Sequence, residues 1–119
     1  MSTLAEIQRL AWQIAEEQGQ HEGLRELSAR DQLLIRCAFL HGEVSEIGDF
    51  AKKYGVAPAL HHIAQECADV LIHLAELCQQ FGIDLDTAVA LKMDRNRQRP
   101  YGYGTPLDRQ ETRDDPDAL

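Results

Sequence analysis

The sequence is poor in aromatic residues, in cysteine and in positive charge. Aromatic side chains make up 6% of the 119 residues, so aliphatic side chains must supply most of the core packing. There are three cysteines, an odd number, and no two form a C-x-x-C pair. This argues against a disulfide framework and against a structural zinc site. We therefore expect the cysteines to be small apolar core residues: Cys37, Cys67 and Cys78.

Long apolar runs are also missing. No run approaches the roughly 20 residues that span a bilayer, and the N-terminus has neither the basic flank nor the apolar stretch of a signal peptide. The net charge is −8, which argues against nucleic-acid binding because that affinity comes mostly from neutralising phosphates. We predict a cytoplasmic protein that binds neither membrane nor nucleic acid. A local excess of basic residues at 92–99 can still meet the phosphates of a small ligand.

In contrast, apolar residues recur at helical spacing along most of the sequence. Ser2 or Thr3 is the expected first N-cap, and Asp84 that of the last helix. Residues 1–100 are predicted to form one helical domain. Residues 101–119 form an acidic, aperiodic tail that we predict to be disordered. The predicted helices run from about Thr3 to Gln18, from Ala29 to Tyr54, from Pro58 to just before Gly82, and from Leu85 to about Arg97.

The two central helices have matching apolar stripes at heptad spacing. Only about three residues join them, so they should fold back as an antiparallel pair. We predict an all-α fold in which this hairpin and the flanking helices form a four-helix bundle, completed by assembly into a homodimer or homotetramer. Apolar residues off the stripe also favour assembly: Leu34, Ile35, Ala38, Phe39 and Phe50. The stripes are Leu33, Cys37, Leu40, Val44, Ile47, Ala51 and Tyr54, and Leu60, Ala64, Cys67, Leu71, Leu74, Cys78 and Phe81.

Two carboxylate pairs lie in the middle of these helices. Glu43 and Glu46 form an E-x-x-E pair, and Glu66 and Asp69 form an E-x-x-D pair. Residues three apart are neighbours on a helix surface. In an antiparallel hairpin centred on residue 56, Glu46 comes level with Glu66, and Glu43 with Asp69. The sequence therefore predicts that the four carboxylates converge.

Four neighbouring carboxylates repel one another and raise one another's pKa values, so a cation is expected among them. Mg²⁺ fits best because it prefers oxygen ligands and shares its shell with water and phosphates; Mn²⁺ is the alternative. Di-iron bundles supply Glu-x-x-His motifs, and no histidine here has a Glu three residues before it. The competing interpretation is a solvated acidic face without a metal. His41 and His73 border the acidic residues and can tune them or bind substrate.

The sequence resembles the MazG-like family of all-α nucleoside triphosphate pyrophosphohydrolases. The resemblance rests on LHGEVSEIGDF (40–50), on ECADVLIHLAELCQQFGIDLDTAVALKMDRNRQRPYG (66–102) and on the 19 residues between the two motifs. It covers about residues 30–104. Tyr103 departs from the family, in which a basic residue or histidine is expected.

The resemblance implies a metal site and a reaction. It implies that Glu43, Glu46, Glu66 and Asp69 ligate Mg²⁺, with Glu43 and Glu46 as the catalytic candidates, although the sequence does not decide which carboxylate accepts the proton. In such enzymes water attacks the α-phosphorus and releases a nucleoside monophosphate and pyrophosphate. The resemblance also implies that Lys92 and Asn96 contact the substrate phosphates, and Arg99 lies on the same helix face.

Three interpretations remain open at this stage. The first is a pyrophosphohydrolase acting on a dNTP or a modified NTP. The second keeps the fold and changes the substrate to dUTP, dCTP or a phosphoribosyl-nucleotide. The third is a helical oligomerisation or interaction module without catalytic activity, in which the carboxylates form only a charged face.

Overall fold

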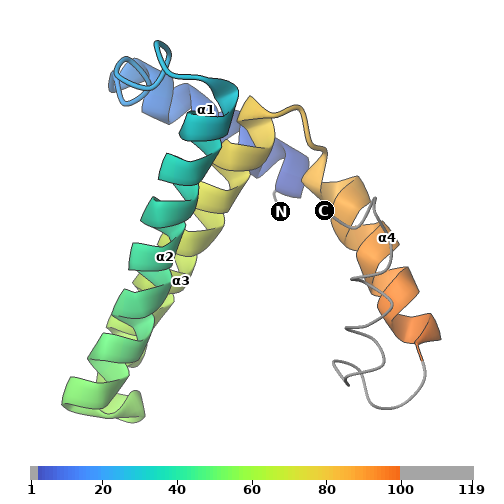
Figure 1. Ribbon diagram of the computed structural model, residues 1–119. Helices are drawn as coiled ribbons and strands as arrows, with labels where there is room; N and C mark the ends of the chain where they lie inside the picture. The colour runs from blue at the N-terminus through green and yellow to red at the C-terminus, as the bar shows by residue number, and fades with distance from the viewer. Residues whose placement is uncertain (1–2, 100–119) are drawn as a thin grey trace. The chain divides into compact units, whose positions relative to one another are not determined.

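The computed structural model describes residues 3–99, and within them the regular structure is entirely helical (Figure 1). The predicted all-α class is confirmed for this part of the chain, and the predicted tail at 101–119 lies outside the described residues. The helices are α1 (Leu4–Glu17), α2 (Ala29–Tyr54), α3 (Val56–Gln80) and α4 (Leu85–Gln98).

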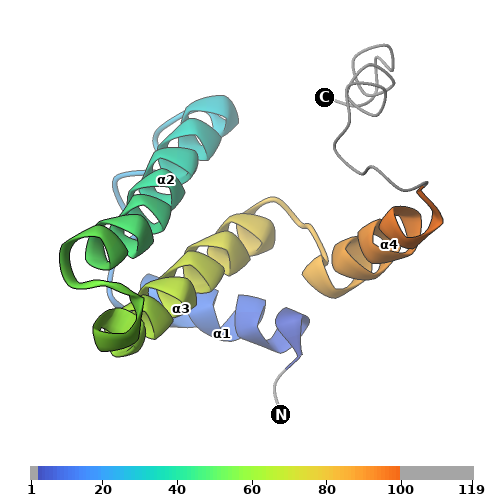
Figure 2. The ribbon, with the colours of Figure 1, turned by 90° about the horizontal axis from the view of Figure 1, so that it is seen from below.

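The chain divides into two compact units, Met1–Asp86 and Thr87–Leu119. In the first unit α2 and α3 run antiparallel and side by side, and α1 packs across α3 (Figures 1 and 2). The predicted helical hairpin is thereby confirmed. The described part of the second unit is the remainder of α4.

Side-chain caps fix three of the four helix starts. Thr3 accepts a hydrogen bond from the backbone N–H of Glu6 at 3.1 Å, so Thr3 rather than Ser2 caps α1. Ser28 caps α2 in the same way, at 3.1 Å from the N–H of Asp31. The predicted cap Asp84 accepts from the N–H of Asp86 at 3.1 Å. Each cap satisfies a backbone donor that has no partner inside the helix.

Gly55 alone makes the turn between α2 and α3. Its φ of +77° lies in the left-handed region that glycine enters without a steric penalty. It ends α2 as predicted, but α3 begins directly afterwards, at Val56. The prediction that this helix starts at Pro58 is therefore wrong by two residues. Pro58 is accommodated in the first turn because its missing N–H would have had no intrahelical partner there.

The least exposed positions of the hairpin coincide with the predicted apolar stripes only in part. Val44 is 53% exposed, and Cys37 and Cys67 are exposed as well. On each helix one series of buried and half-buried positions follows the same 4-3 rhythm but includes charged residues. These positions are Arg36, Leu40, Glu43, Ile47 and Phe50 on α2, and Ala59, Ile63, Glu66, Val70, His73 and Leu77 on α3. The predicted stripe is wrong at most positions because charged side chains occupy the seam between the helices.

The predicted register of the hairpin is confirmed by contacts between its two helices. The Phe50 and His62 rings stack with centroids 4.8 Å apart, and both residues lie six positions from residue 56. Arg36 and Glu76 form an ion pair at 3.6 Å, and both lie 20 positions from residue 56. Residues equally far from the turn therefore come level, as the sequence predicts.

The α3–α4 connection is tied back to α1 by polar contacts. The buried Gln8 side chain donates to the carbonyl of Ile83 at 2.7 Å and accepts from the N–H of Leu85 at 2.8 Å. The Asp86 carboxylate accepts from the N–H groups of Leu4 and Ala5, at 3.2 and 3.0 Å. A carboxylate is favourable here because it meets both the unpaired N–H groups and the positive end of the α1 dipole.

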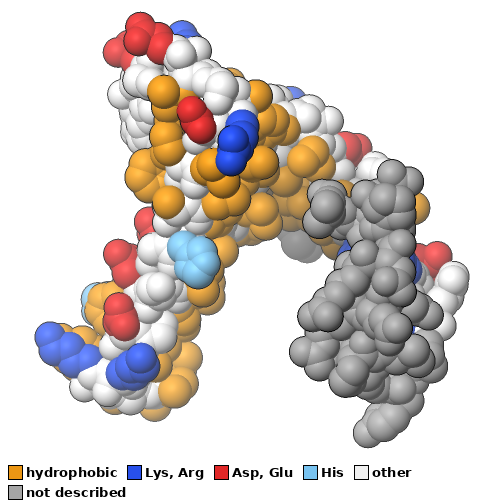
Figure 3. Space-filling view, in the orientation of Figure 1, with side chains coloured by type: hydrophobic (Ala, Val, Ile, Leu, Met, Phe, Trp, Pro, Cys, Tyr) orange, Lys and Arg blue, Asp and Glu red, His pale blue; other side chains and the backbone are white. Residues whose placement is uncertain are grey.

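The buried apolar core is small, and no large side chain among the described residues is fully enclosed. Its members are Ala11, Ala15, Ala59, Ala75, Cys78 and Leu85. The prediction that all three cysteines lie in the core holds only for Cys78, whose thiol pKa is raised by burial. Many larger apolar side chains remain exposed over α1, α2 and α3 (Figure 3). Within residues 3–99, no helix is both long enough and apolar enough to cross a membrane.

Candidate metal centre

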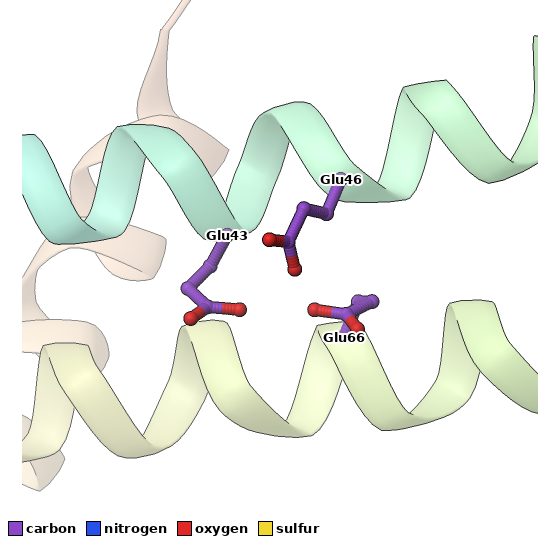
Figure 4. Close-up of side chains that lie close together, drawn as sticks. All are labelled: Glu43, Glu46 and Glu66. Carbon is purple, nitrogen blue, oxygen red and sulfur yellow. The ribbon is translucent and has the colours of Figure 1, made fainter.

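Three of the four predicted carboxylates converge between α2 and α3. Glu43 and Glu46 come from α2 and Glu66 from α3, and each places a carboxylate oxygen within 4.8 Å of the others (Figure 4). Glu43 and Glu66 are half-buried at seam positions, and Glu46 is exposed. We call these three residues the carboxylate cluster.

Asp69, the fourth predicted ligand, is not a member of this cluster. Three residues advance a helix by about 300°, so Asp69 is turned by about 60° from Glu66 around α3. It is exposed and lines a cavity together with α1 side chains such as Ile7 and Leu10. It remains close enough to act electrostatically, because its charge contributes to the raised pKa of Glu46.

The carboxylate cluster concentrates negative charge that no lysine or arginine among residues 3–99 balances by an ion pair. The pKa of Glu46 is raised above 4.5, first by its hydrogen bond to the Glu66 carboxyl and then by the charge of Glu66, with smaller effects from burial, Asp69 and Asp49. Among residues 3–99, no lysine or arginine lies within ion-pair distance of the cluster; its one partner of that kind is His73. The Glu46 carboxyl therefore binds a proton more readily than an isolated carboxyl does.

One carboxylate oxygen of the cluster lacks a partner altogether. Glu66 Oε2 is buried and makes no hydrogen bond, an arrangement that costs free energy unless something compensates it. The three side chains of the cluster offer carboxylate oxygens as metal ligands, the ligand type that Mg²⁺ and Mn²⁺ prefer. The residues present therefore fit a hard divalent cation.

Sequence reasoning missed a second set of charged residues on the same seam. Arg36 and Glu76 form a buried ion pair, with side chains only 6% and 9% exposed. Arg36 also donates from Nε to Gln80 and lies over the Trp12 ring, 5.5 Å from its centroid. The available signal was heptad spacing, because Arg36 and Glu43 lie seven residues apart and so share a helix face.

His73 links this pair to the carboxylate cluster. Its Nε2 lies 3.6 Å from Glu43 Oε1, and its Nδ1 lies 4.0 Å from Glu76 Oε2. His73 is seven residues from Glu66 and shares its face of α3. The sequence placed it only beside the acidic residues, whereas the structure places it between two carboxylates.

Two cavities adjoin His73. One, of about 330 Å³, is lined by residues that include His21, Arg36, Phe39, Glu43 and Glu76. The other, of about 440 Å³, is mostly apolar and has Asp69 on its wall. Space for a small organic ligand therefore borders the carboxylate cluster.

The pKa of His21, in the wall of the smaller cavity, is lowered first by burial and then by the charge of Arg36, against an opposing effect of Glu76.

Of the predicted phosphate contacts, Lys92 and Asn96 belong to α4 and Arg99 directly follows it, all in the second unit. Lys92 and Asn96 are exposed, and the backbone N–H of Arg99 donates to the carbonyl of Asn96 at 3.2 Å. Lys92 and Asn96, four residues apart within α4, have the predicted helical spacing. Their role toward a phosphorylated ligand stays a prediction.

Comparison of the chain with protein-family models, with curated proteins and with solved structures finds no match. No family is shown in this way, and the MazG-like resemblance stays a prediction that rests on the motifs.

Proposed function

We propose that this protein is a Mg²⁺-dependent pyrophosphohydrolase that cleaves a nucleoside triphosphate, or its deoxy form, to the monophosphate and pyrophosphate. The observation that carries the proposal is the carboxylate cluster, in which Glu43, Glu46 and Glu66 converge from two helices without a lysine or arginine partner among the described residues. The E-x-x-E and E-x-x-D motifs support the same reaction through the MazG-like resemblance.

Glu43, Glu46 and Glu66 would hold Mg²⁺, or Mn²⁺ in its place, and Asp69 would complete the ligand set from the flank of α3. The bound ion would neutralise triphosphate charge and polarise the phosphoryl oxygens under attack. The three clustered carboxylates already lie within 4.8 Å of one another, so little rearrangement is needed to share an ion. Asp69 would have to move toward the seam, because it is not a member of the cluster.

Glu43 and Glu46 are the proposed catalytic residues. A water oxygen forms a bond to the α-phosphorus, and the bond from that phosphorus to the α–β bridging oxygen breaks. The water proton passes to a carboxylate oxygen, and the electron pair of the broken bond leaves with pyrophosphate. Glu46 is the exposed member of the cluster, so solvent water reaches it most directly. We therefore assign proton acceptance to Glu46.

The remainder of the nucleotide would occupy the cavities beside His73. Lys92, Asn96 and Arg99 would contact its phosphates, because cationic and amide groups on one helix face suit an extended anion. dUTP, dCTP or a phosphoribosyl-nucleotide is the alternative substrate class. Such metabolites belong to the cytoplasm, which is where we expect the protein.

The exposed apolar surface supports assembly into a homodimer or homotetramer. Leu34, Phe39 and Val44 on α2 are each more than half exposed, and monomers seldom leave large apolar patches in contact with solvent. A second copy packed against some of these exposed apolar side chains would complete a four-helix bundle around α2 and α3. The same surface favours a second candidate function, a helical interaction module without catalytic activity.

Product analysis separates these functions. Incubation with a panel of dNTPs and Mg²⁺ should release pyrophosphate rather than orthophosphate, and Glu46→Gln should reduce the rate at least about 100-fold, the usual scale for loss of a general base. Glu26→Gln, which changes an exposed carboxylate outside the cluster, is the matched control and should leave the rate unchanged.

Equal turnover by wild type and Glu46→Gln would remove Glu46 from the mechanism. Release of orthophosphate would reject the pyrophosphohydrolase reaction. An interaction module predicts a third outcome, in which no substrate is consumed and millimolar Mg²⁺ leaves the melting temperature unchanged.

A further inference from the structure

His73 lies between two carboxylates that have different surroundings. Nε2 faces Glu43 of the carboxylate cluster at 3.6 Å, and Nδ1 faces Glu76 at 4.0 Å. The imidazole thus has one carboxylate near each ring nitrogen. Its side chain is 32% exposed, so the ring is partly enclosed, and the Phe39 ring lies 6.3 Å away, centroid to centroid.

Glu76 is held firmly from the other side. Its carboxylate is 9% exposed and pairs with Arg36, which is 6% exposed. Arg36 is itself held by Gln80, which donates in turn to Gln32, and by the Trp12 ring. Buried ion pairs of this kind cost desolvation energy and are weak sources of net stability. Here the pair holds the Glu76 carboxylate beside Nδ1 of His73.

Glu43 has no comparable anchor of its own. Among the described residues its only ion-pair contact is with His73. Carboxylates that ligate metals are generally oriented by hydrogen bonds from a surrounding shell of residues, and removal of such a partner typically weakens metal affinity by about 10- to 100-fold. His73 Nε2, at an ion-pair distance of 3.6 Å from Glu43 Oε1, is the group that would serve as such a partner.

We propose that His73 is a positioning residue that orients the Glu43 carboxylate for the divalent cation, with its ring set in place by Glu76 and the buried Arg36. The proposal rests on the proposed metal centre, since it assigns His73 a role toward that ion. It does not depend on the identity of the nucleotide. Nε2 is the atom that orients Glu43, and the contact of Nδ1 with Glu76 serves only to hold the ring in place.

Two substitutions distinguish the two sides of the ring. The amide nitrogen of glutamine reaches roughly where Nε2 lies, whereas that of asparagine reaches only as far as Nδ1. His73→Gln therefore retains a donor toward Glu43, and His73→Asn does not. His61→Asn, an exposed histidine near the turn, is the control. The probe is Mn²⁺ without nucleotide, with the free ion counted by electron paramagnetic resonance.

His73→Asn should raise the Kd for Mn²⁺ about tenfold or more, while His73→Gln and His61→Asn stay within about threefold of wild type. The melting temperatures of the metal-free variants should remain within about 3 °C of wild type, because substitutions at partly exposed sites usually change stability only slightly. A loss of affinity without a loss of stability is a result that a purely structural role would not give.

Equal affinities for the asparagine and glutamine variants, whether both normal or both weakened, would overturn the role of His73. Absence of Mn²⁺ binding by the wild type would overturn the metal centre itself, and with it this role. Mn²⁺ binding as expected, together with no pyrophosphate release from any dNTP, would reject the proposed reaction and leave the role of His73 at the metal site in place.

Discussion

The α2–α3 hairpin carries buried or half-buried charge in two regions that differ in how it is balanced. At the end where α1 crosses, Arg36 neutralises Glu76 within the protein. In the middle of the helices, Glu43, Glu46 and Glu66 converge with only His73 as an ion-pair partner among residues 3–99. One region is electrostatically complete, and the other has a surplus of negative charge.

This difference separates a structural use of charge from a functional one. A balanced pair such as Arg36 and Glu76 needs nothing from solution. An unbalanced group of carboxylates stays close together only at a cost, unless protons or cations are bound. We therefore interpret the Arg36 region as a support for the hairpin, and the surplus of negative charge at the carboxylate cluster is what motivates the proposed cation site.

The largest expected effect comes from breaking the balanced region. Arg36→Met should destabilise the protein by about 3–5 kcal/mol, because it leaves the Glu76 carboxylate buried without a partner. Urea unfolding at fixed protein concentration measures the change. Arg30→Met, at an exposed arginine, should have little effect. The double variant Arg36→Met/Glu76→Met should recover much of the loss, and a double variant as unstable as the single one would contradict this account.

A smaller effect is expected when a divalent cation is added to balance the charge of the carboxylate cluster. Mg²⁺ at 100 times its Kd should stabilise the folded protein by about 2.7 kcal/mol, a rise in melting temperature of about 10 °C or more for a chain of this size. Thermal unfolding with and without the ion measures it. Glu66→Gln should abolish the rise and Glu26→Gln should retain it. A rise that persists in Glu66→Gln would place the ion elsewhere.

The smallest effect is a pH dependence of the metal-free protein. The pKa of Glu46 is raised from 4.5 in the folded state by Glu66 and the neighbouring acids, so folding favours the protonated form. The stability that this proton contributes is complete below pH 4.5 and is lost as the pH rises through the folded-state pKa. Relative to Glu46→Gln, wild type should therefore melt at progressively lower temperature across this window. If the melting temperatures of wild type and Glu46→Gln changed with pH in parallel, the neighbouring acids would have no effect on the Glu46 carboxyl.

Much of the fold was predictable because local signals coincide with the tertiary structure. The caps at Thr3 and Asp84, the glycine at 55 and the helical periodicity lie close together in sequence and act through the backbone of their own helix. The hairpin register followed from the short turn. The predicted start of α3 was two residues late because Pro58 is tolerated at several first-turn positions and so does not mark the first one.

The side-chain arrangement was less predictable. A heptad pattern identifies an apolar stripe, but it does not show which face meets the neighbouring helix when α2 is apolar on several sides. Here charged residues take seam positions, so Val44 and Cys67 lie exposed. The ligand prediction was affected in the same way. Glu66 is on the seam and joins the cluster, whereas Asp69, three residues further on, is turned to the flank.

The sequence by itself determined the helices, their order, the antiparallel hairpin and the level at which its carboxylates meet, because all of these depend on local backbone chemistry and on distance from a tight turn. Only the tertiary structure decided that three carboxylates converge, that Arg36 neutralises Glu76, and that His73 lies between the two groups. These contacts depend on the rotation of each helix about its own axis. That rotation is set by packing across the whole interface, to which no single spacing in the sequence corresponds.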